Sequence, residues 1–253
     1  MTASSPALGA HPVAAPPTTP TAGAQPTTHF RRIAGAIALV VAPWGFVGAN
    51  AAYAWATRNG GDDLTGAHAL ALARAHPDMV HFATVAVMLG CLLVVPAVLA
   101  AMRLLRPHAP KLALFAGSSM IAGYICYLGA VTQNYATLAM AERGGPVRDY
   151  VAVLDAAQSD PTGTWAFILF AFGNLVGTLL LAIAMFRSRP ALPVWAAIGV
   201  AAWPVLHVTG LVVGSEWFEV TGAVLQAAGF AAIAAVVLRT RDDDWDPLPA
   251  HVG

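Results

Sequence analysis

The chain has 253 residues, of which 58% are hydrophobic and only 10% are Asp, Glu, Lys or Arg. A soluble globular domain has roughly 25% charged residues, so this composition excludes an ordinary soluble enzyme and indicates a protein of the lipid bilayer. The 13 basic and 13 acidic residues cancel in formal charge. We expect no nucleic-acid partner, because proteins that bind nucleic acids present a strongly basic surface.

Residues 1–29 are predicted to form a disordered cytoplasmic tail. Pro, Ala and Thr dominate this stretch, and its first 28 residues include no charged side chain and no continuous apolar run. A secretory signal needs a basic start and an apolar run of about 7 to 15 residues, so we expect none here. Such a composition buries too little apolar surface to offset the entropy lost on ordering. A docking peptide is the alternative interpretation of this tail.

Six apolar segments follow, and each is long enough to cross the roughly 30 Å hydrocarbon core of a bilayer. Each must be helical, because a helix satisfies its own backbone hydrogen bonds where no water can do so. The predicted fold class is therefore all-α, a polytopic membrane protein with a six-helix transmembrane bundle over residues 30–241. The expected spans are approximately 33–57, 79–102, 112–137, 164–186, 194–214 and 217–238.

The distribution of Lys and Arg predicts the orientation of the bundle. With both termini in the cytoplasm, nine of the 13 basic residues lie on the inner side and four on the outer side. This bias favours cytoplasmic N- and C-termini, which also require an even number of spans. Residues 242–253 then form a short acidic cytoplasmic tail, and its Asp242 to Asp244 run is interpreted as a solvated end. The inner cations are Arg31, Arg32, Arg103, Arg106, Lys111, Arg187, Arg189, Arg239 and Arg241.

Two outer joints are predicted to contain helices. Pro146 suits the start of a helix, where a missing N–H has no cost, and apolar residues recur at helical spacing after it. Residues 64–75, rich in Ala and Leu and followed by Pro77, are expected to form another helix. Asp160 is expected to cap the fourth span. Packing on the membrane surface explains both joint helices, and a lid over a site beneath them is the alternative.

Polar side chains at membrane depth are the best pointers to function, because they are costly to place there. Under the predicted orientation they gather in the outer half of the bundle and near the midplane, whereas the inner half is almost entirely hydrocarbon. This distribution predicts a polar cavity that opens outward and holds a lipid or small molecule. The candidate ligand-binding residues are Asn50, His81, Gln133, Asn134, Asn174 and Gln226.

The sixth span has the most distinct polar face. Glu216, Glu219, Ala223 and Gln226 lie at i, i+3, i+7 and i+10 and so share one side of a helix. Glu219 lies deep enough to share a proton with His207, and this pair is the candidate catalytic acid and base if the protein is an enzyme. The alternative is structural, because acids in the first turn of a helix complement its dipole. That alternative accounts for Glu216 completely.

We predict no metal and no cofactor. His81, His207 and Glu219 would form a two-histidine, one-carboxylate set acceptable to zinc or iron, but three different spans supply them without the local spacing of a metal motif. Haem held by the two histidines would lack the paired histidines of multi-haem cytochromes. Cys91 and Cys126 lie near the midplane, and the outer joints have no cysteine, so we expect no disulfide framework.

Aromatic residues deep in the spans are interpreted mainly as packing residues. Tyr124 and Tyr127 share a face of the third span with Asn134, and this face either lines a cavity or packs against a neighbouring helix. Trp203 lies deep in the fifth span, away from the interfaces where tryptophan serves as an anchor. Packing is the simpler explanation for all of these rings.

Residues 92–107 read LLVVPAVLAAMRLLRP, and a Gly-rich third span follows them. Together with the flanking residues, over 81–129, this stretch resembles multi-span integral membrane proteins of high-GC actinobacteria. The resemblance implies an actinobacterial host and a bacterial plasma membrane. It brings no established activity, and no functional residue is carried over from it.

Three functions stay open on these observations. The preferred one is a non-catalytic membrane protein that holds a lipid or small molecule in its cavity, or that has a structural or accessory role. The second is an intramembrane enzyme that acts on a lipid or isoprenoid through His207 and Glu219. The third is a small proton-coupled transporter, against which the apolar inner half counts. Membrane lipids are the expected partners, and the sequence is compatible with an oligomer.

Overall fold

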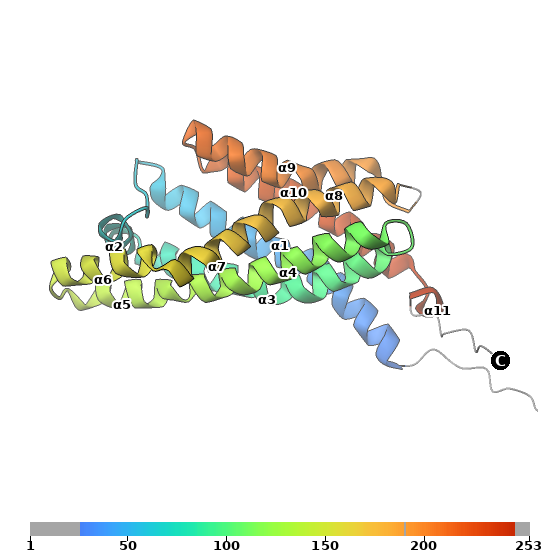
Figure 1. Ribbon diagram of the computed structural model, residues 1–253, viewed down its shortest axis with the longest axis horizontal. Helices are drawn as coiled ribbons and strands as arrows, with labels where there is room; N and C mark the ends of the chain where they lie inside the picture. The colour runs from blue at the N-terminus through green and yellow to red at the C-terminus, as the bar shows by residue number, and fades with distance from the viewer. Residues whose placement is uncertain (1–25, 190, 246–253) are drawn as a thin grey trace, which may run out of the picture.

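The computed structural model describes residues 26–189 and 191–245. Within these residues every regular element is a helix, and six helices are long and apolar enough to cross a membrane (Figure 1). The predicted all-α, six-span fold class is therefore confirmed. Of the predicted tails, residues 1–25 and 246–253 lie outside the described part of the chain.

Five of the six spans are longer than predicted, the first and the third by the most. The first span begins at Pro26, and proline is common in the first turn of a helix. Residues 26–29, which were expected to belong to the tail, are therefore helical. The third continues past a break at Thr132 and ends before Gly144, which has a positive φ of 62°. The spans are α1 (Pro26–Thr57), α3 (Pro77–Leu105), α4 (Pro110–Val131) with α5 (Gln133–Arg143), α7 (Pro161–Ala171) with the π-helix η1 (Phe172–Gly177) and α8 (Thr178–Arg187), α9 (Val194–Val213) and α10 (Trp217–Arg239).

The six spans form a closed ring. Helix α1 packs on α3, α3 on α4, and α4 on the continuous run of α7, η1 and α8. Helix α8 packs on α9, α9 on α10, and α10 returns to α1. Large apolar side chains such as Trp44, Phe115 and Ile198 are more than half exposed on the outside of this ring. Such outward apolar faces are expected where hydrocarbon is the solvent.

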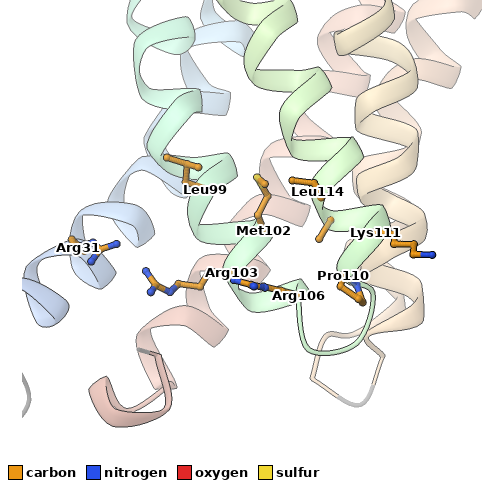
Figure 2. Close-up of a pocket in the computed structure, with 9 residues that line it drawn as sticks. Arg31, Leu99, Met102, Arg103, Arg106, Pro110, Lys111 and Leu114 are labelled. Atoms are coloured by element: carbon orange, nitrogen blue, oxygen red, sulfur yellow. The ribbon is translucent and has the colours of Figure 1, made fainter. Parts of the chain in front are cut away.

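The two ends of the bundle differ in charge. At one end, here called the basic end, α1, α3 and α4 carry Arg31, Arg103, Arg106 and Lys111 (Figure 2). The short helix α11 (Asp242–Trp245) lies at the same end (Figure 1). The orientation of this end toward the cytoplasm stays a prediction.

Helix α11 corrects the prediction of a solvated acidic end at Asp242, whereas Asp243 and Asp244 are exposed as expected. Asp242 accepts a hydrogen bond from Arg32 Nε at 2.7 Å, and Arg32 Nη1 donates to the carbonyl oxygen of Leu238 at 2.9 Å. The bond from Arg32, with another from His29, holds the pKa of the Asp242 carboxyl below its usual range. A buried guanidinium needs an anionic partner. The first acid of the run therefore ties the end of α10 to the start of α1.

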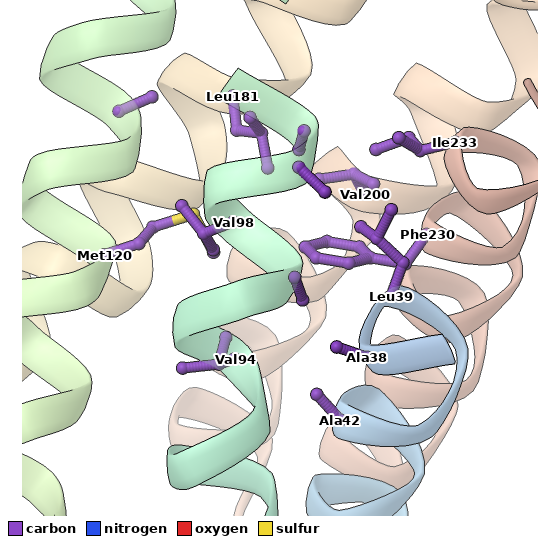
Figure 3. Packing of buried hydrophobic residues seen from close by; sticks show 14 of the residues in the cluster. Ala38, Leu39, Ala42, Val94, Val98, Met120, Leu181, Val200, Phe230 and Ile233 are labelled. Carbon is purple, nitrogen blue, oxygen red and sulfur yellow. The ribbon is translucent and has the colours of Figure 1, made fainter. Parts of the chain in front are cut away.

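The hydrophobic core lies between the basic end and the middle of the bundle. Leu39 of α1, Val98 of α3 and both Phe230 and Ile233 of α10 are at most 2% exposed and meet there (Figure 3). Alanine occupies many of the other buried positions in this cluster. Its small side chain lets helices approach closely, which matters because lipid gives no hydrophobic drive between them.

The opposite end, here called the cap end, is covered by α2 (Gly66–Ala75) and α6 (Val147–Ser159) (Figure 1). Both predicted joint helices are thereby confirmed. The backbone N–H of Gly66 donates to Asp155 Oδ1 at 2.7 Å and ties the two helices together. Asp160 accepts hydrogen bonds from two backbone N–H groups of α7, which confirms the predicted cap of the fourth span.

Candidate functional site

A cavity of about 210 Å³ lies inside the bundle, on the cap-end side of the core. All six spans contribute to its wall. On α1 and α10 the lining residues Asn50 and Glu219 lie nearer the cap end than the core residues Leu39 and Phe230. The lining residues are Phe46, Asn50, Val87, Tyr124, Tyr127, Phe167, Phe170, Ala171, Asn174, Leu175, Trp203, His207, Glu219 and Gln226.

Asn174 joins three spans through a single oxygen atom. Its Oδ1 accepts a hydrogen bond from the Tyr124 hydroxyl at 2.8 Å and another from Trp203 Nε1 at 2.9 Å. All three side chains are buried, with Asn174 only 4% exposed. An unsatisfied polar group is costly in a membrane interior, so this shared acceptor stabilises the arrangement of α4, η1 and α9.

The π-helix η1 positions Asn174. Glycine makes this segment possible at its contact with α4, where a Cβ on Gly173 would collide with the carbonyl oxygen of Ser119. A Cβ on Gly123 of α4 would in turn lie 3.0 Å from the Gly173 Cα. The two backbones therefore touch directly. A π-helical turn inside an α-helix is rare and occurs frequently at functional sites.

His207 and Glu219 form the pair that the sequence predicts as an acid and base. His207 Nδ1 lies 2.9 Å from Glu219 Oε1, and the side chains are only 23% and 13% exposed. The two atoms are close, but they are not aligned as a hydrogen bond. A histidine and a carboxyl group side by side in a cavity wall are the kinds of side chain that serve as general acid and base. The ring of Trp203 lies against His207, with 5.3 Å between the ring centroids.

Two buried polar atoms of the cavity wall lack hydrogen-bond partners among the described residues. They are Asn50 Nδ2 and His207 Nδ1. A buried polar group without a partner costs about 1 to 3 kcal/mol, so each such group in a native structure requires an explanation. Both atoms belong to side chains that line the same cavity. A molecule in the cavity that offers an oxygen acceptor would satisfy the Asn50 amide.

Aromatic rings form the apolar side of the cavity. Tyr127 stacks on Phe170, with 3.9 Å between centroids and an angle of 6° between the ring planes. Tyr124 meets Phe170 edge-on and packs against Phe46 at 4.9 Å. Phe167 completes the group through an edge contact with Phe170. The cavity thus combines one polar wall with one rigid aromatic wall, which is typical of sites that hold small molecules.

Acidic side chains gather at the cap end, next to the His207–Glu219 pair. The Tyr53 hydroxyl donates to Asp63 Oδ1 at 2.8 Å. Glu216 lies in the joint before α10, and partial burial raises the pKa of its carboxyl. The neighbouring charges of Glu219 and Asp63 raise that pKa further, against the opposing effect of His207. The Glu216 carboxyl therefore favours its protonated form more than a solvated carboxyl does.

Three predicted ligand-binding residues lie outside this cavity. His81 is exposed on α3 and packs edge-on against Tyr135, and Gln133 is exposed at the start of α5. Asn134 Nδ2 donates to Thr84 Oγ1 at 3.2 Å and lines a separate cavity of about 80 Å³ beside α2. The expectation of one cavity shared by all six candidates is therefore wrong. Asn134 is two helical turns beyond Tyr127, about 10 Å nearer the cap end.

The remaining predicted residues come together. Asn50, Asn174 and Gln226 line the cavity with His207 and Glu219, and the sequence separations between them reach 176 residues. The sequence assigns Trp203 only to packing, yet it donates to Asn174 and lines the cavity. A sequence signal for it exists, because Trp203 precedes His207 by four residues and so shares its helix face. The phenylalanines of α7 give no such signal, since they belong to an apolar run.

Among the described residues, no group of three or more His, Cys, Asp and Glu side chains is placed to hold a metal ion. The set of His81, His207 and Glu219 does not form, because His81 lies away from the cavity. Comparison of the chain with protein-family models, with curated proteins and with solved structures gives no match.

Proposed function

We propose that this integral membrane protein binds a small hydrophobic molecule with a polar oxygen in the cavity between its spans. One observation carries the proposal, namely that the buried Asn50 Nδ2, in the wall of an aromatic-lined cavity, has no hydrogen-bond partner among the described residues. The Asn50 amide nitrogen is a donor, so its partner must be an acceptor. A carbonyl or hydroxyl oxygen on an apolar body, as in many lipids and isoprenoids, meets this requirement.

The size of the cavity limits the part of the ligand that it encloses. Pockets for drug-sized molecules have volumes of about 300 to 1,000 Å³, and this cavity has about 210 Å³. It therefore suits a single ring or a short head, while a longer apolar chain would extend between the helices. The stacked rings of Tyr127 and Phe170 support the choice of a flat, apolar group beside the polar oxygen.

A binding role agrees with the packed core better than transport does. Leu39, Val98, Phe230 and Ile233 are almost completely buried between the cavity and the basic end (Figure 3). A transported molecule or proton would need polar groups or water along this path. We therefore favour a protein that holds its ligand over a proton-coupled carrier.

An enzyme that uses acid and base chemistry is the second candidate. The observation that favours it is the 2.9 Å separation of His207 Nδ1 and Glu219 Oε1 at the cavity wall. A histidine and a carboxyl group within reach of one molecule can transfer a proton to or from it. The substrate would then be the lipid or isoprenoid itself, and the two residues would be catalytic.

The test of binding is to identify the molecule that the protein retains. Full-length protein in nanodiscs is analysed by untargeted mass spectrometry beside the variants Asn50→Leu and Glu219→Gln. His81→Ala is the matched control, because this histidine lies in a span but outside the cavity. We expect the wild type and the control to retain the same molecule. Loss of a buried partner should lower retention by the two cavity variants about tenfold or more.

The same experiment separates the candidate functions. Equal retention by all four folded proteins, or no retained molecule in the wild type, would contradict the binding proposal. A Glu219→Gln variant that accumulates a chemically different molecule from that of the wild type would identify an enzyme. A matched loss in both cavity variants, with one unchanged chemical species, supports binding alone.

We also propose a bacterial plasma membrane, with both termini in the cytoplasm. The excess of Lys and Arg at the basic end supports this orientation. Single cysteines replace Ala67 on α2 or His108 before α4, in a background with Cys91→Ala and Cys126→Ala. A maleimide that cannot cross membranes should label the Ala67→Cys variant in intact cells. It should label the His108→Cys variant only after permeabilisation, and the reverse pattern would overturn the orientation.

A further inference from the structure

A second, larger hollow lies at the basic end, at the opposite end of the core from the ligand cavity. It has a volume of about 610 Å³. Helices α1, α3 and α4 form it, and Figure 2 shows its side chains along the lower edge of the bundle. We call it the basic groove. Its lining residues are Arg31, Leu99, Met102, Arg103, Arg106, Pro110, Lys111, Ala113 and Leu114.

All the charged side chains that line the basic groove are positively charged. Three helices contribute Arg31, Arg103, Arg106 and Lys111, and the described residues that line the groove include no acid. Arg31, Arg106 and Lys111 are exposed. Arg103 is partly buried, and its guanidinium lies 5.6 Å from the centre of the Trp245 ring. Such a concentration of positive charge attracts anions, and guanidinium groups can bind a phosphate through two hydrogen bonds.

The position of these cations in the bilayer follows from the spans. Helix α3 ends at Leu105 and α4 begins at Pro110, so the intervening turn lies where two spans leave the membrane. Arg103, Arg106 and Lys111 are therefore at the depth of lipid headgroups.

The groove continues from these cations along the apolar surface of the spans. Leu99 and Leu114 are more than half exposed, and they lie above the cations in Figure 2, farther into the membrane. The groove is thus basic at the headgroup level and apolar at the acyl-chain level. This is the chemistry of a phospholipid with a charged head, in the same order along the membrane normal.

We propose that the basic groove binds an anionic phospholipid of the surrounding leaflet. Its phosphate lies beside Arg103 and Arg106, Lys111 adds positive charge at the same depth, and its acyl chains lie along Leu99 and Leu114. Basic pockets between transmembrane helices are known to hold anionic lipid headgroups. This site is distinct from the ligand cavity, because the core separates the two. The proposal does not depend on the proposed function of that cavity.

The test compares two variants that lose the same charge at the same end of the bundle. Arg106→Gln with Lys111→Gln removes two exposed cations of the groove. Arg187→Gln with Arg189→Gln removes two exposed cations outside the groove, at the end of α8 and in the joint that follows it. The Tm of detergent-solubilised full-length protein is measured while phosphatidylglycerol, phosphatidylcholine or inorganic phosphate is added.

We expect phosphatidylglycerol to raise the Tm of the wild type, and phosphatidylcholine and inorganic phosphate to leave it nearly unchanged. The groove variant should need about 30-fold more phosphatidylglycerol for half of the effect, since each cation close to the bound headgroup contributes about a fivefold change. The control variant should match the wild type. If the double variant does not fold, Arg106→Gln and Lys111→Gln alone should each show about a fivefold change.

Three outcomes would overturn the proposal. An equal loss in the Arg187 and Arg189 variant would mean that the charge of the whole end, and not the groove, attracts the lipid. An equal rise in Tm with inorganic phosphate would mean a site for free anions. No difference between phosphatidylglycerol and phosphatidylcholine in the wild type would mean that no anionic lipid is selected.

Discussion

The half of the bundle near the basic end and the half near the cap end use the same helices in different ways. Along α1 and α10, Leu39 and Phe230 fill the first half, whereas Asn50 and Glu219 face a cavity in the second. Helices in lipid gain nothing from burying apolar surface against each other, so the first half depends on close packing. The second half leaves space and polar atoms for another molecule. Stability and binding are thus placed at different depths of the membrane.

The cavity half nevertheless has its own structural support. Asn174 Oδ1 accepts two hydrogen bonds from two different helices, and these use both lone pairs of the oxygen. The Asn50 amide nitrogen, by contrast, has no hydrogen-bond partner among the described residues, and His207 Nδ1 has only the Glu219 carboxyl group beside it. The comparison therefore divides the cavity residues into those that hold the helices and those that meet a ligand. Substitutions in the two halves test this division.

The largest effect is expected from Phe230→Ala in the core. This ring is 2% exposed, and its removal leaves a void in a packed interior. We expect the free energy of unfolding to fall by about 3 kcal/mol, at the low end for such substitutions because lipid removes the hydrophobic transfer contribution. Unfolding in mixed micelles with increasing dodecyl sulfate measures this change. Retention of the cavity ligand by the folded protein should not change.

The control for this substitution is Phe115→Ala on α4. That ring is 66% exposed on the outer face of the bundle. Its removal should change the free energy of unfolding by less than about 0.5 kcal/mol. Equal losses in the two variants would show that the core is not packed as tightly as its burial indicates, and the comparison between the halves would fail.

A smaller loss, with a different consequence, is expected from Asn174→Leu. The substitution preserves the approximate volume but leaves the Tyr124 hydroxyl and Trp203 Nε1 without their shared acceptor. We expect a loss of about 2 kcal/mol, because hydrogen bonds between membrane helices contribute about 0.6 to 2 kcal/mol each. Unlike Phe230→Ala, it should also lower ligand retention, because the helices of the cavity wall lose the hydrogen bonds that hold them in place. Gln133→Leu, at an exposed position outside the cavity, should do neither.

The sequence predicts the two halves unequally well. The fold class follows from apolar length alone, since a bilayer admits only helices for segments of this composition. The pairing of His207 with Glu219 is also predictable, because each stands near the same end of an adjacent pair of spans. The π-helix at Asn174 is not predictable, because it depends on the contact of Gly173 with α4. The break at Thr132 is not predictable either, because it depends on the local geometry of one turn.

The failures at His81 and Gln133 have a common cause. Depth along a span can be counted from the sequence, but the direction in which a side chain points around the helix depends on its neighbours. His81 has the expected depth and lies on an exposed face of α3. The role of Asp242 escapes prediction for a similar reason, since its partner Arg32 is 210 residues away in the chain. Only the closure of the ring between α1 and α10 brings the two together.

The two ends of the bundle should also differ in their response to pH. At the basic end, the hydrogen bond from Arg32 lowers the pKa of Asp242 below its ordinary value of 3.8. The Asp242 carboxylate therefore stabilises the fold above pH 3.8, and this contribution is lost as pH falls through the lowered pKa. Asp242→Asn should reduce the Tm at neutral pH. The difference from the wild type should shrink toward pH 3, and a constant difference would contradict the ion pair.

At the cap end, the contribution of Glu216 to stability should change with pH in the opposite direction. This change should be the smallest of those predicted, because the Glu216 carboxyl is only partly buried. Burial and the charges of Glu219 and Asp63 raise its pKa above the ordinary value of 4.5. The unfolded chain then ionises first as pH rises, so Glu216 lowers the stability of the fold between pH 4.5 and its raised pKa, and the cost is constant above it. Glu216→Gln should therefore raise the Tm at neutral pH and leave it unchanged at pH 4. A Tm that falls at neutral pH would show instead that the Glu216 carboxylate stabilises the fold, and the two ends would then share one sign of pH dependence.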